Sequence, residues 1–149
     1  MLKPGTKAPR IKTKTSKGNE FDSFELLDKK NLVVFFFPKS NTKGCTVQAC
    51  AFRDAYEDFL LHDAEVVGVS GDSVEEQDSF SESQQFPFPL IQDSDNQLRK
   101  LFEVPKTLWF IPGRTTFVIN KKGLIIHAFN AQFQFEEHAE EAIQALRSQ

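Results

Sequence analysis

Two cysteines, Cys45 and Cys50, are the residues of this chain best placed for covalent chemistry. They follow the apolar run Leu32 to Phe37 and lie where that run gives way to a helical pattern. A cysteine at a strand-to-helix turn sits beside free backbone N–H groups and the positive end of the helix dipole, which both favour the thiolate. Because the thiolate is the reactive form of cysteine, the sequence predicts a nucleophile at Cys45. Cys50, five residues later, is placed to react with the product that forms at Cys45.

The residues that precede Cys45 fit a thiolate site. Thr42 lies three residues earlier, close enough for its hydroxyl to donate a hydrogen bond to the sulfur or to a bound substrate oxygen. Gly44 lets the backbone approach closely, and Pro38 ends the apolar run and shapes the loop. An arginine from elsewhere in the chain would supply a fixed positive charge.

The spacing of the two cysteines limits how they can pair. Residues five apart in one α-helix are separated by about 7.5 Å along the axis, and their side chains point about 140° apart. A disulfide needs Cα atoms within roughly 7 Å. Cys45 and Cys50 therefore cannot bond while such a helix is intact, and any bond between them requires its first turns to unwind.

The rest of the sequence predicts one α/β domain over residues 1–149. Leu32 to Phe37 shows no polar alternation, which is typical of a central strand buried on both faces. Lys7 to Leu27 indicates an N-terminal strand or hairpin followed by a helical turn. This order predicts a thioredoxin-like fold, with a central mixed β-sheet flanked by helices and the N-terminal strand or hairpin as an extension. Further strands are expected at 65–70, 90–91, 115–120 and 124–129, and helices at 45–61, 73–84, 95–102 and 135–147.

Composition and charge narrow the class of partner. With 40% hydrophobic and 26% charged residues, the chain fits a soluble globular class. Its net charge of -3 gives no electrostatic reason to expect a nucleic acid or an anionic membrane as partner. No apolar run approaches the roughly 20 residues that a membrane-spanning helix needs, and the N-terminus has no apolar signal segment. We expect a bacterial cytoplasmic protein, or one of the plastid stroma or lumen from which a transit peptide has been removed.

The chain resembles the peroxiredoxins at these residues. Pro38, Thr42 and Cys45 fit the Pro-x-x-x-Thr-x-x-Cys signature of that family. The added Cys50 fits the bacterioferritin comigratory protein, or peroxiredoxin Q, branch of that family, and residues 112–119 and 130–134 resemble its cyanobacterial and plastid forms most. The resemblance covers nearly the whole chain, and its blocks are residues 44–54, 67–72, 112–119 and 130–134.

The resemblance implies a thiol-dependent peroxidase that reduces hydrogen peroxide and organic hydroperoxides. Cys45 would attack the O–O bond and become a sulfenic acid, and Cys50 would condense with it to an intramolecular disulfide. Thr42 and Arg114 would activate the thiolate and stabilise charge on the peroxide oxygens, while Pro38 would shield the site from water. A thioredoxin-type dithiol would reduce the disulfide. The resemblance further implies a monomer with no cofactor and no metal.

Three residues depart from the family pattern. Phe37 stands where tyrosine is frequent, Ser40 where an acidic residue is frequent, and Phe135 where a proline is usual. We expect Phe37 to alter the preference among peroxides, because a hydroxyl is lost there. We expect Ser40 and Phe135 not to touch the core chemistry.

Other interpretations of the cysteines remain open to different degrees. A non-enzymatic redox sensor, in which oxidation of Cys45 and Cys50 changes the shape of the chain for a partner, would react once rather than turn over. A Cys–His protease would need His62, His127 or His138 beside Cys45 in space. A zinc site usually needs four nitrogen or sulfur ligands, which two cysteines and scattered histidines do not supply.

Some residues near the signature have two readings. Gln48 either faces the pocket or is an ordinary helix residue. Arg53 ranks behind Arg114, because a helix arginine is usually solvated or ion-paired at the surface. Trp109 to Pro112 is an apolar loop before Arg114 that more often forms core or pocket wall than a docking surface.

Overall fold

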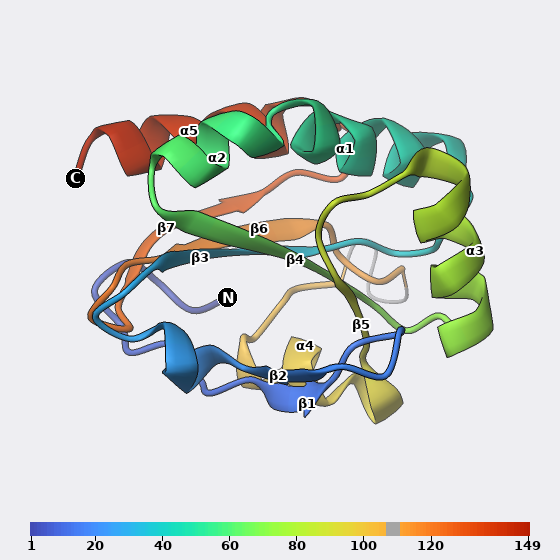
Figure 1. Ribbon diagram of the computed structural model, residues 1–149, viewed down its shortest axis with the longest axis horizontal. Helices are drawn as coiled ribbons and strands as arrows, with labels where there is room; N and C mark the ends of the chain where they lie inside the picture. The colour runs from blue at the N-terminus through green and yellow to red at the C-terminus, as the bar shows by residue number, and fades with distance from the viewer. Residues whose placement is uncertain (107–110) are drawn as a thin grey trace.

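The computed structural model describes residues 1–106 and 111–149, which build a five-stranded sheet in the order β5-β4-β3-β6-β7 (Figure 1). β3 pairs in parallel with β4 and antiparallel with β6, β4 pairs in parallel with β5, and β6 pairs antiparallel with β7. This mixed sheet, flanked by helices, confirms the predicted α/β class. The strands are β3 Asn31–Phe36, β4 Ala64–Ser70, β5 Leu90–Gln92, β6 Thr115–Ile119 and β7 Ile125–Asn130.

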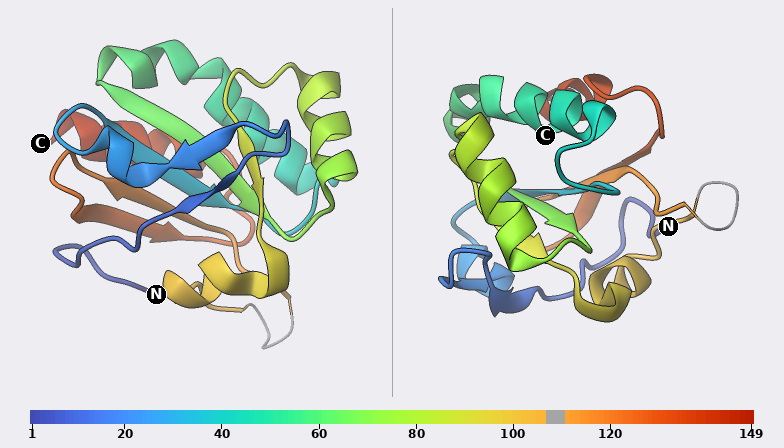
Figure 2. Two further views of the ribbon diagram at one scale, coloured as in Figure 1. Left: turned by 60° about the horizontal axis from the view of Figure 1, so that its bottom comes forward. Right: turned by 90° about the vertical axis from the view of Figure 1, so that its right-hand side faces the viewer.

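The two faces of the sheet carry different layers (Figure 2). Helices α1, α2, α3 and α5 cover one face and its right-hand edge in Figure 1, and α4 lies with the N-terminal hairpin on the other. The predicted hairpin is confirmed as β1 Lys12–Lys14 paired antiparallel with β2 Glu20–Asp22, followed by a 3-10 turn at Ser23–Leu26. The helices are α1 Lys43–Asp54, α2 Tyr56–Leu61, α3 Val74–Gln84, α4 Gln97–Leu101 and α5 Glu137–Arg147.

β3 is the central strand, and every one of its residues is buried. Its side chains alternate between two cores: Phe35 stacks on Phe52 of α1 with ring centroids 4.3 Å apart, and Phe36 meets Phe117 of β6 at 6.0 Å. A strand buried on both faces needs apolar residues at every position, which is the pattern in the sequence. β3 therefore anchors the loop that follows it, and that loop leads to Cys45.

The predicted helix over 45–61 is two helices. α1 begins two residues earlier than predicted, at Lys43 after its N-cap Thr42, and ends before Ala55, where φ is -94° and ψ is 4°. The sequence has no proline or glycine at this break. Tertiary contacts instead hold the start of α2, because Tyr56 packs against Phe88 and its hydroxyl donates to Glu65 at 3.3 Å.

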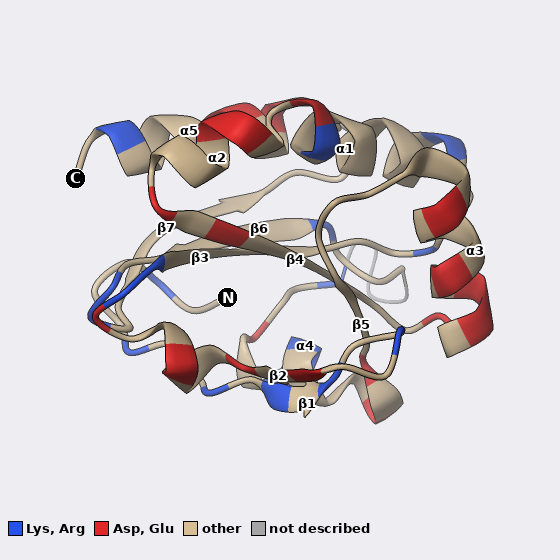
Figure 3. Cartoon of the chain, in the orientation of Figure 1, with Lys and Arg blue, Asp and Glu red and all other residues tan. Residues whose placement is uncertain are grey.

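The predicted boundaries of α3 are confirmed, and those of two other helices shift. Ser73 and Glu76 form the expected capping box, and the acidic first turn complements the helix dipole (Figure 3). α4 begins at Gln97 rather than at residue 95, because Asp95 and Asn96 have left-handed φ values of 55° and 56°. α5 begins at Glu137, because the ring of Phe135 packs away from the helix, against α1.

Trp109 and Phe110, expected as core or pocket wall, lie outside the described residues. Across residues 1–106 and 111–149, no helix has the length and apolar character that crossing a bilayer takes.

His138 on α5 is a fully buried residue that ties the helix to the sheet. Its Nδ1 lies 2.8 Å from the Thr116 hydroxyl and its Nε2 lies 2.8 Å from the carbonyl oxygen of Ala131. Burial lowers the pKa of His138 from 6.5 to about 4, and the nearby Arg114 charge adds to the fall while the bond to Ala131 opposes it. The folded protein therefore keeps this imidazole neutral.

We predict that His138 makes stability fall on acidification. The unfolded chain binds a proton at His138 below about pH 6.5, whereas the folded chain binds it only near pH 4. The contribution of His138 to the free energy of unfolding is therefore fully present above pH 6.5 and is lost as the pH falls toward 4. The loss from one such group is about 1.4 kcal/mol per pH unit. Urea unfolding at several pH values should show a shallower slope for His138→Gln than for the parent. His127→Gln, at a half-exposed histidine, is the control, and equal slopes in all three proteins would contradict the prediction.

Candidate active site

Cys45 is the third residue of α1, in the first turn of the helix that follows β3. Its side chain is 1% exposed, and both cysteines are free thiols. The first hydrogen bond of α1 runs from the Thr46 N–H to the carbonyl of the N-cap Thr42. The backbone N–H groups before Thr46 have no acceptor within the helix and point out of its N-terminal end. The predicted placement of Cys45 at a helix N-terminus is therefore found in the structure.

Arg114 directly precedes β6, the antiparallel neighbour of β3, and contacts Cys45 from there. β6 runs antiparallel to β3 with Thr115 opposite Phe36, so the residue before β6 lies beside the end of β3 that leads to Cys45. Arg114 is 4% exposed, and its Nη1 donates to the Cys45 sulfur at 3.3 Å while its Nε donates to the Gln132 carbonyl at 3.0 Å. A buried cation thus lies against the sulfur.

Gln48 joins this pair from the next turn of α1. It is fully buried, and its Oε1 accepts from the same Arg114 Nη1 at 2.5 Å. Its Nε2 has no hydrogen-bond partner among the described residues. Gln48 therefore faces the site, which settles between the two readings that the sequence allowed.

Arg99 is a site-forming residue that the sequence reasoning missed. Its guanidinium is 7% exposed and donates to the carbonyls of Gly113 at 2.7 Å and Phe37 at 2.9 Å. Burial lowers the pKa of Arg99, and the negative charges of Asp93 and of a Cys45 thiolate oppose that fall. Arg99 thereby joins the segment before Pro38 to the segment before Arg114. Its only sequence signal is its place one helical turn before the buried Phe102, on the same face of α4.

Thr42 and Pro38 are near the sulfur in the chain but bond differently from the expectation. The Thr42 hydroxyl donates to the Lys39 carbonyl at 2.8 Å rather than to the sulfur, and it makes no capping bond. It closes the turn between β3 and α1. Pro38 lies half-buried at the start of that turn, directly after the buried Phe37.

Ser40 ties the same turn to the end of β4. Its backbone N–H and its hydroxyl both donate to Oδ2 of Asp72 at 2.7 Å, and the Ser70 hydroxyl donates to that oxygen at 2.7 Å. Asp72 is 7% exposed, so its charge is held by three donors in place of water. Ser40 thus has a structural role in holding this turn.

Phe135, which we expected not to touch the core chemistry, lies beside two residues of the site. Its ring centroid lies 4.8 Å from the guanidinium carbon of Arg114, and its edge lies against Gly44. Sequence patterns do not show such a contact, because residues 44, 114 and 135 meet only in the folded chain. Phe37 instead faces the core, where its ring packs against Phe35 and Phe80.

Cys50 lies on the far side of α1, half-buried against the end of α3. Its thiol donates to the Gln84 side-chain oxygen at 3.4 Å, and Arg53 donates to the Gln84 backbone carbonyl at 2.8 Å. Burial raises the pKa of the Cys50 thiol; Arg53 opposes the rise and Asp54 adds to it. Cys50 is thus held as a protonated thiol, away from Cys45.

The histidines bond elsewhere and give no support to a Cys–His dyad. His62 Nδ1 lies 2.8 Å from the Asp58 carbonyl, His127 Nε2 lies 2.9 Å from Glu141, and His138 is enclosed by Thr116 and Ala131. In the described part of the chain, no three His, Cys, Asp or Glu residues gather in a way that could hold a metal ion.

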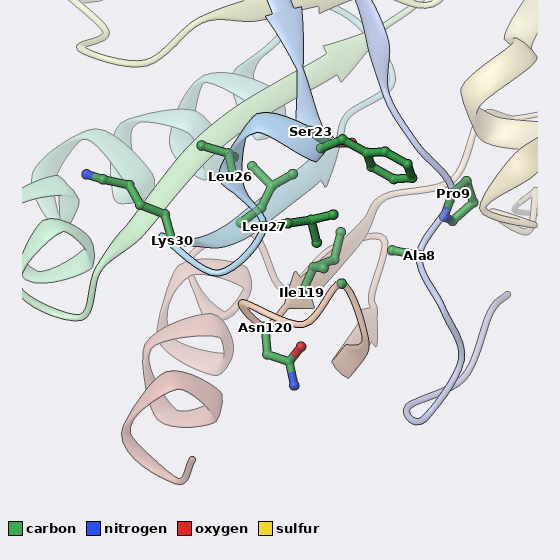
Figure 4. A pocket seen from close by; sticks show the side chains of 11 residues that line it. Ala8, Pro9, Ser23, Leu26, Leu27, Lys30, Ile119 and Asn120 are labelled. Atoms are coloured by element: carbon green, nitrogen blue, oxygen red, sulfur yellow. The ribbon is translucent and has the colours of Figure 1, made fainter.

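A surface pocket near the N-terminal segment lies away from this site (Figure 4). It is lined by Leu27, Leu32 and Ile119, among others. Leu32 and Ile119 are paired at the end of β3 opposite to the one that leads to Cys45. The pocket therefore has no part in chemistry at the sulfur.

Comparison with known proteins identifies the family. The family model described as AhpC/TSA family matches residues 4–128. Peroxiredoxin Q, chloroplastic, of Sedum lineare is 47% identical over 80% of the chain, which spans 64% of that relative. Peroxiredoxin Q, chloroplastic, of Populus jackii is 42% identical over 93% of the chain and 71% of the relative.

Solved structures agree in fold over almost the full length. Peroxidoxin BcpB from Mycobacterium tuberculosis has a TM-score of 0.90 and 32% identity over 99% of this chain and 98% of its own. A bacterioferritin comigratory protein from Xanthomonas campestris, whose structure concerns alkyl peroxide reduction, has a TM-score of 0.84 and 28% identity over 93% and 90%. Together with the family model and the plant relatives, they show that the chain belongs to the AhpC/TSA family, in its peroxiredoxin Q branch, and has the thioredoxin-like fold of these peroxiredoxins.

Proposed function

We propose that this chain is a thiol-dependent peroxidase in which Cys45 reduces the peroxide and Cys50 resolves the oxidised sulfur. The observation that carries the proposal is the Arg114 Nη1 atom 3.3 Å from the Cys45 sulfur, at the N-terminal turn of α1. A fixed cation and a helix N-terminus both stabilise a thiolate over a thiol. The names of the plant relatives and of the Xanthomonas campestris structure support the same chemistry.

In the first step, the Cys45 thiolate attacks one oxygen of the peroxide. A sulfur–oxygen bond forms, the O–O bond breaks, and the released oxygen takes a proton and leaves as an alcohol or water. The sulfur is oxidised to a sulfenic acid. Negative charge moves from sulfur toward the leaving oxygen during this step, and the buried guanidinium of Arg114 stabilises it along that path.

In the second step, the Cys50 thiol attacks the sulfenic sulfur, a disulfide forms and water leaves. α1 is continuous across both cysteines, so they lie about 7.5 Å apart along its axis, too far for a disulfide. The helix therefore unwinds before the bond forms. Unwinding breaks the contacts of Cys50 and Arg53 with Gln84 and brings Cys50 into water, where its thiol ionises more readily.

In the third step, an external reductant reduces the disulfide. Peroxiredoxin chemistry requires a peroxide substrate and such a reductant, and we propose a thioredoxin-type dithiol, which transfers two electrons by thiol–disulfide exchange. We propose that the chain works as a monomer, since both cysteines of the cycle lie on one helix. We propose the bacterial cytoplasm or the plastid stroma or lumen as its compartment; relatives named chloroplastic support the plastid alternative.

Thr42 and Pro38 take supporting roles in the proposal. The Thr42 bond to the Lys39 carbonyl fixes the turn that presents Cys45, and its oxygen keeps a lone pair for a substrate proton. Pro38 covers the turn without offering an N–H group, which limits the access of water to the sulfur. Both roles concern the position of the thiolate rather than electron transfer.

The cysteine assignments are tested by single substitutions. We predict that Cys45→Ser abolishes peroxide consumption in an assay with a thioredoxin system, because no nucleophile remains. Cys50→Ser should react once: after one equivalent of peroxide, mass spectrometry should show a gain of one oxygen, where the parent loses two hydrogens. Sustained turnover by Cys45→Ser would refute the enzyme proposal. A single turnover by the parent, with reductant present, would favour a redox sensor instead.

The role of Gln48 is tested by changing its charge. Gln48→Glu places a carboxylate against Arg114, where it competes for the guanidinium and repels the thiolate. We predict a fall of about ten-fold in the rate constant for hydrogen peroxide at neutral pH, measured by rapid mixing. Gln144→Glu, at an exposed position in the second half of α5, adds the same charge away from the site and should leave the rate unchanged. Equal rates for the two variants would exclude Gln48 from the site.

The unwinding step is tested at Arg53. Arg53→Ala removes the bond to the Gln84 carbonyl, worth about 1 kcal/mol, and should make unwinding of α1 easier. We predict disulfide formation about three- to ten-fold faster, followed by trapping the sulfenic acid at successive times, with an unchanged peroxide rate. Arg147→Ala, which removes an exposed pair with Asp58, is the control. Amides of residues 45–52 should also lose hydrogen-exchange protection on oxidation, and slower resolution in Arg53→Ala would contradict the model.

A further inference from the structure

We propose that Phe135 is a specificity-determining residue, whose ring forms an apolar wall beside Cys45 and favours hydroperoxides with an apolar substituent over hydrogen peroxide. The inference rests on the proposed peroxidase function and adds a substrate preference to it. Three observations carry it: what the ring contacts, how much of it is exposed, and which residue stands at its position.

The ring shares a cation with the reactive sulfur. Its centroid lies 4.8 Å from the guanidinium carbon of Arg114, and Nη1 of that guanidinium donates to the Cys45 sulfur at 3.3 Å. A guanidinium over an aromatic face is attracted by the negative charge of the ring face. Phe135 therefore contacts a residue that itself contacts the reacting sulfur.

The ring also borders the first turn of α1. A Cβ atom added to Gly44 would lie 2.5 Å from Cε1 and 2.7 Å from Cζ of Phe135, closer than real Cβ contacts allow. Gly44 directly precedes Cys45, so the ring edge packs on the backbone beside the sulfur. The lack of a side chain at Gly44 is what permits this approach.

Part of Phe135 remains open to solvent. Phe135 is only partly buried, whereas Cys45 is 1% exposed and Arg114 and Gln48 occupy the inner side of its sulfur. The substituent of a bound hydroperoxide must therefore extend toward the surface, where Gly44 and the Phe135 ring form the border. An alkyl or aryl group gains by leaving water against this ring, and hydrogen peroxide, which has no substituent, gains nothing.

The residue type at this position sets the preference of this chain. Phenylalanine offers a large apolar surface and an aromatic face for Arg114, which a smaller aliphatic side chain at this position would lack. The contact with Arg114 fixes the ring, so little freedom is lost when a substrate packs against it. The chain thus carries a large apolar surface at this border of the site.

The test compares kcat/KM for cumene hydroperoxide with that for hydrogen peroxide within each protein. This ratio is independent of the folded fraction, so a partly unstable variant remains informative. We expect Phe135→Ala to lower the ratio about five- to ten-fold, the size of effect that loss of a contact of one or two methylene groups produces, and Phe135→Leu to retain part of it. An unchanged ratio, or equal losses for both peroxides, would overturn the proposal.

Gly44→Ala provides an independent arm. The added methyl group should push the ring aside and lower the ratio in the parent, but it should add nothing in a Phe135→Ala background. Additive effects would overturn the proposal. Phe133→Ala, at a ring that is 79% exposed, is the control and should leave the ratio unchanged. If the parent does not turn over any peroxide, the peroxidase proposal itself fails; if it turns over both without selectivity from Phe135, only this inference fails.

Discussion

The contact between the Arg114 guanidinium and the Cys45 sulfur is the interaction on which the rest of the site depends. A guanidinium that is 4% exposed has lost its water and needs other partners. The structure supplies the sulfur, the Gln48 oxygen, the Gln132 carbonyl and the face of Phe135. These groups come from α1, from the segment after β7 and from the approach to α5. They can meet only because β6 pairs with β3 in a register that sets Thr115 opposite Phe36.

The same helix meets two opposed demands. When α1 is intact, Cys45 lies in its N-terminal turn, and Cys50 lies on another face of the helix against Gln84. Unwound, it allows the cysteines to join but gives up the groups that favour the thiolate. In the proposed cycle the two demands are met in sequence rather than together: peroxide reacts with the helical form, and the disulfide forms in the unwound one. The contacts of Arg53 and Cys50 with Gln84 set the balance between these forms.

The sequence supports the prediction of those parts that depend on local patterns. The buried run of β3, the capping box at Ser73 and Glu76, the hairpin of β6 and β7, and the helix start near Cys45 all follow from residue type and spacing, and the structure contains them. The parts that escaped depend on partners distant in the chain. Arg99 reads as an ordinary helix arginine until two carbonyls from other segments meet it, and the break at Ala55 has no local breaker. The Thr42 hydroxyl is taken up by the Lys39 carbonyl, a partner that residue type alone does not select, and Phe135 gains its proposed role only by meeting Gly44 and Arg114.

The hydrogen bonds of Arg99 to the carbonyls of Phe37 and Gly113 bear on which part of the site keeps its structure between turnovers. Neither carbonyl belongs to α1, so in the proposed cycle neither contact has to break when that helix unwinds. The approach to Pro38 and the approach to Arg114 therefore stay clamped while Cys45 travels to Cys50. In that cycle, this part of the proposed peroxide site stays in place while the cysteines are oxidised. After reduction, only α1 would have to re-form, because its surroundings keep their structure in this cycle. Recovery would then be a local event at the speed of helix formation, not of folding of the whole chain.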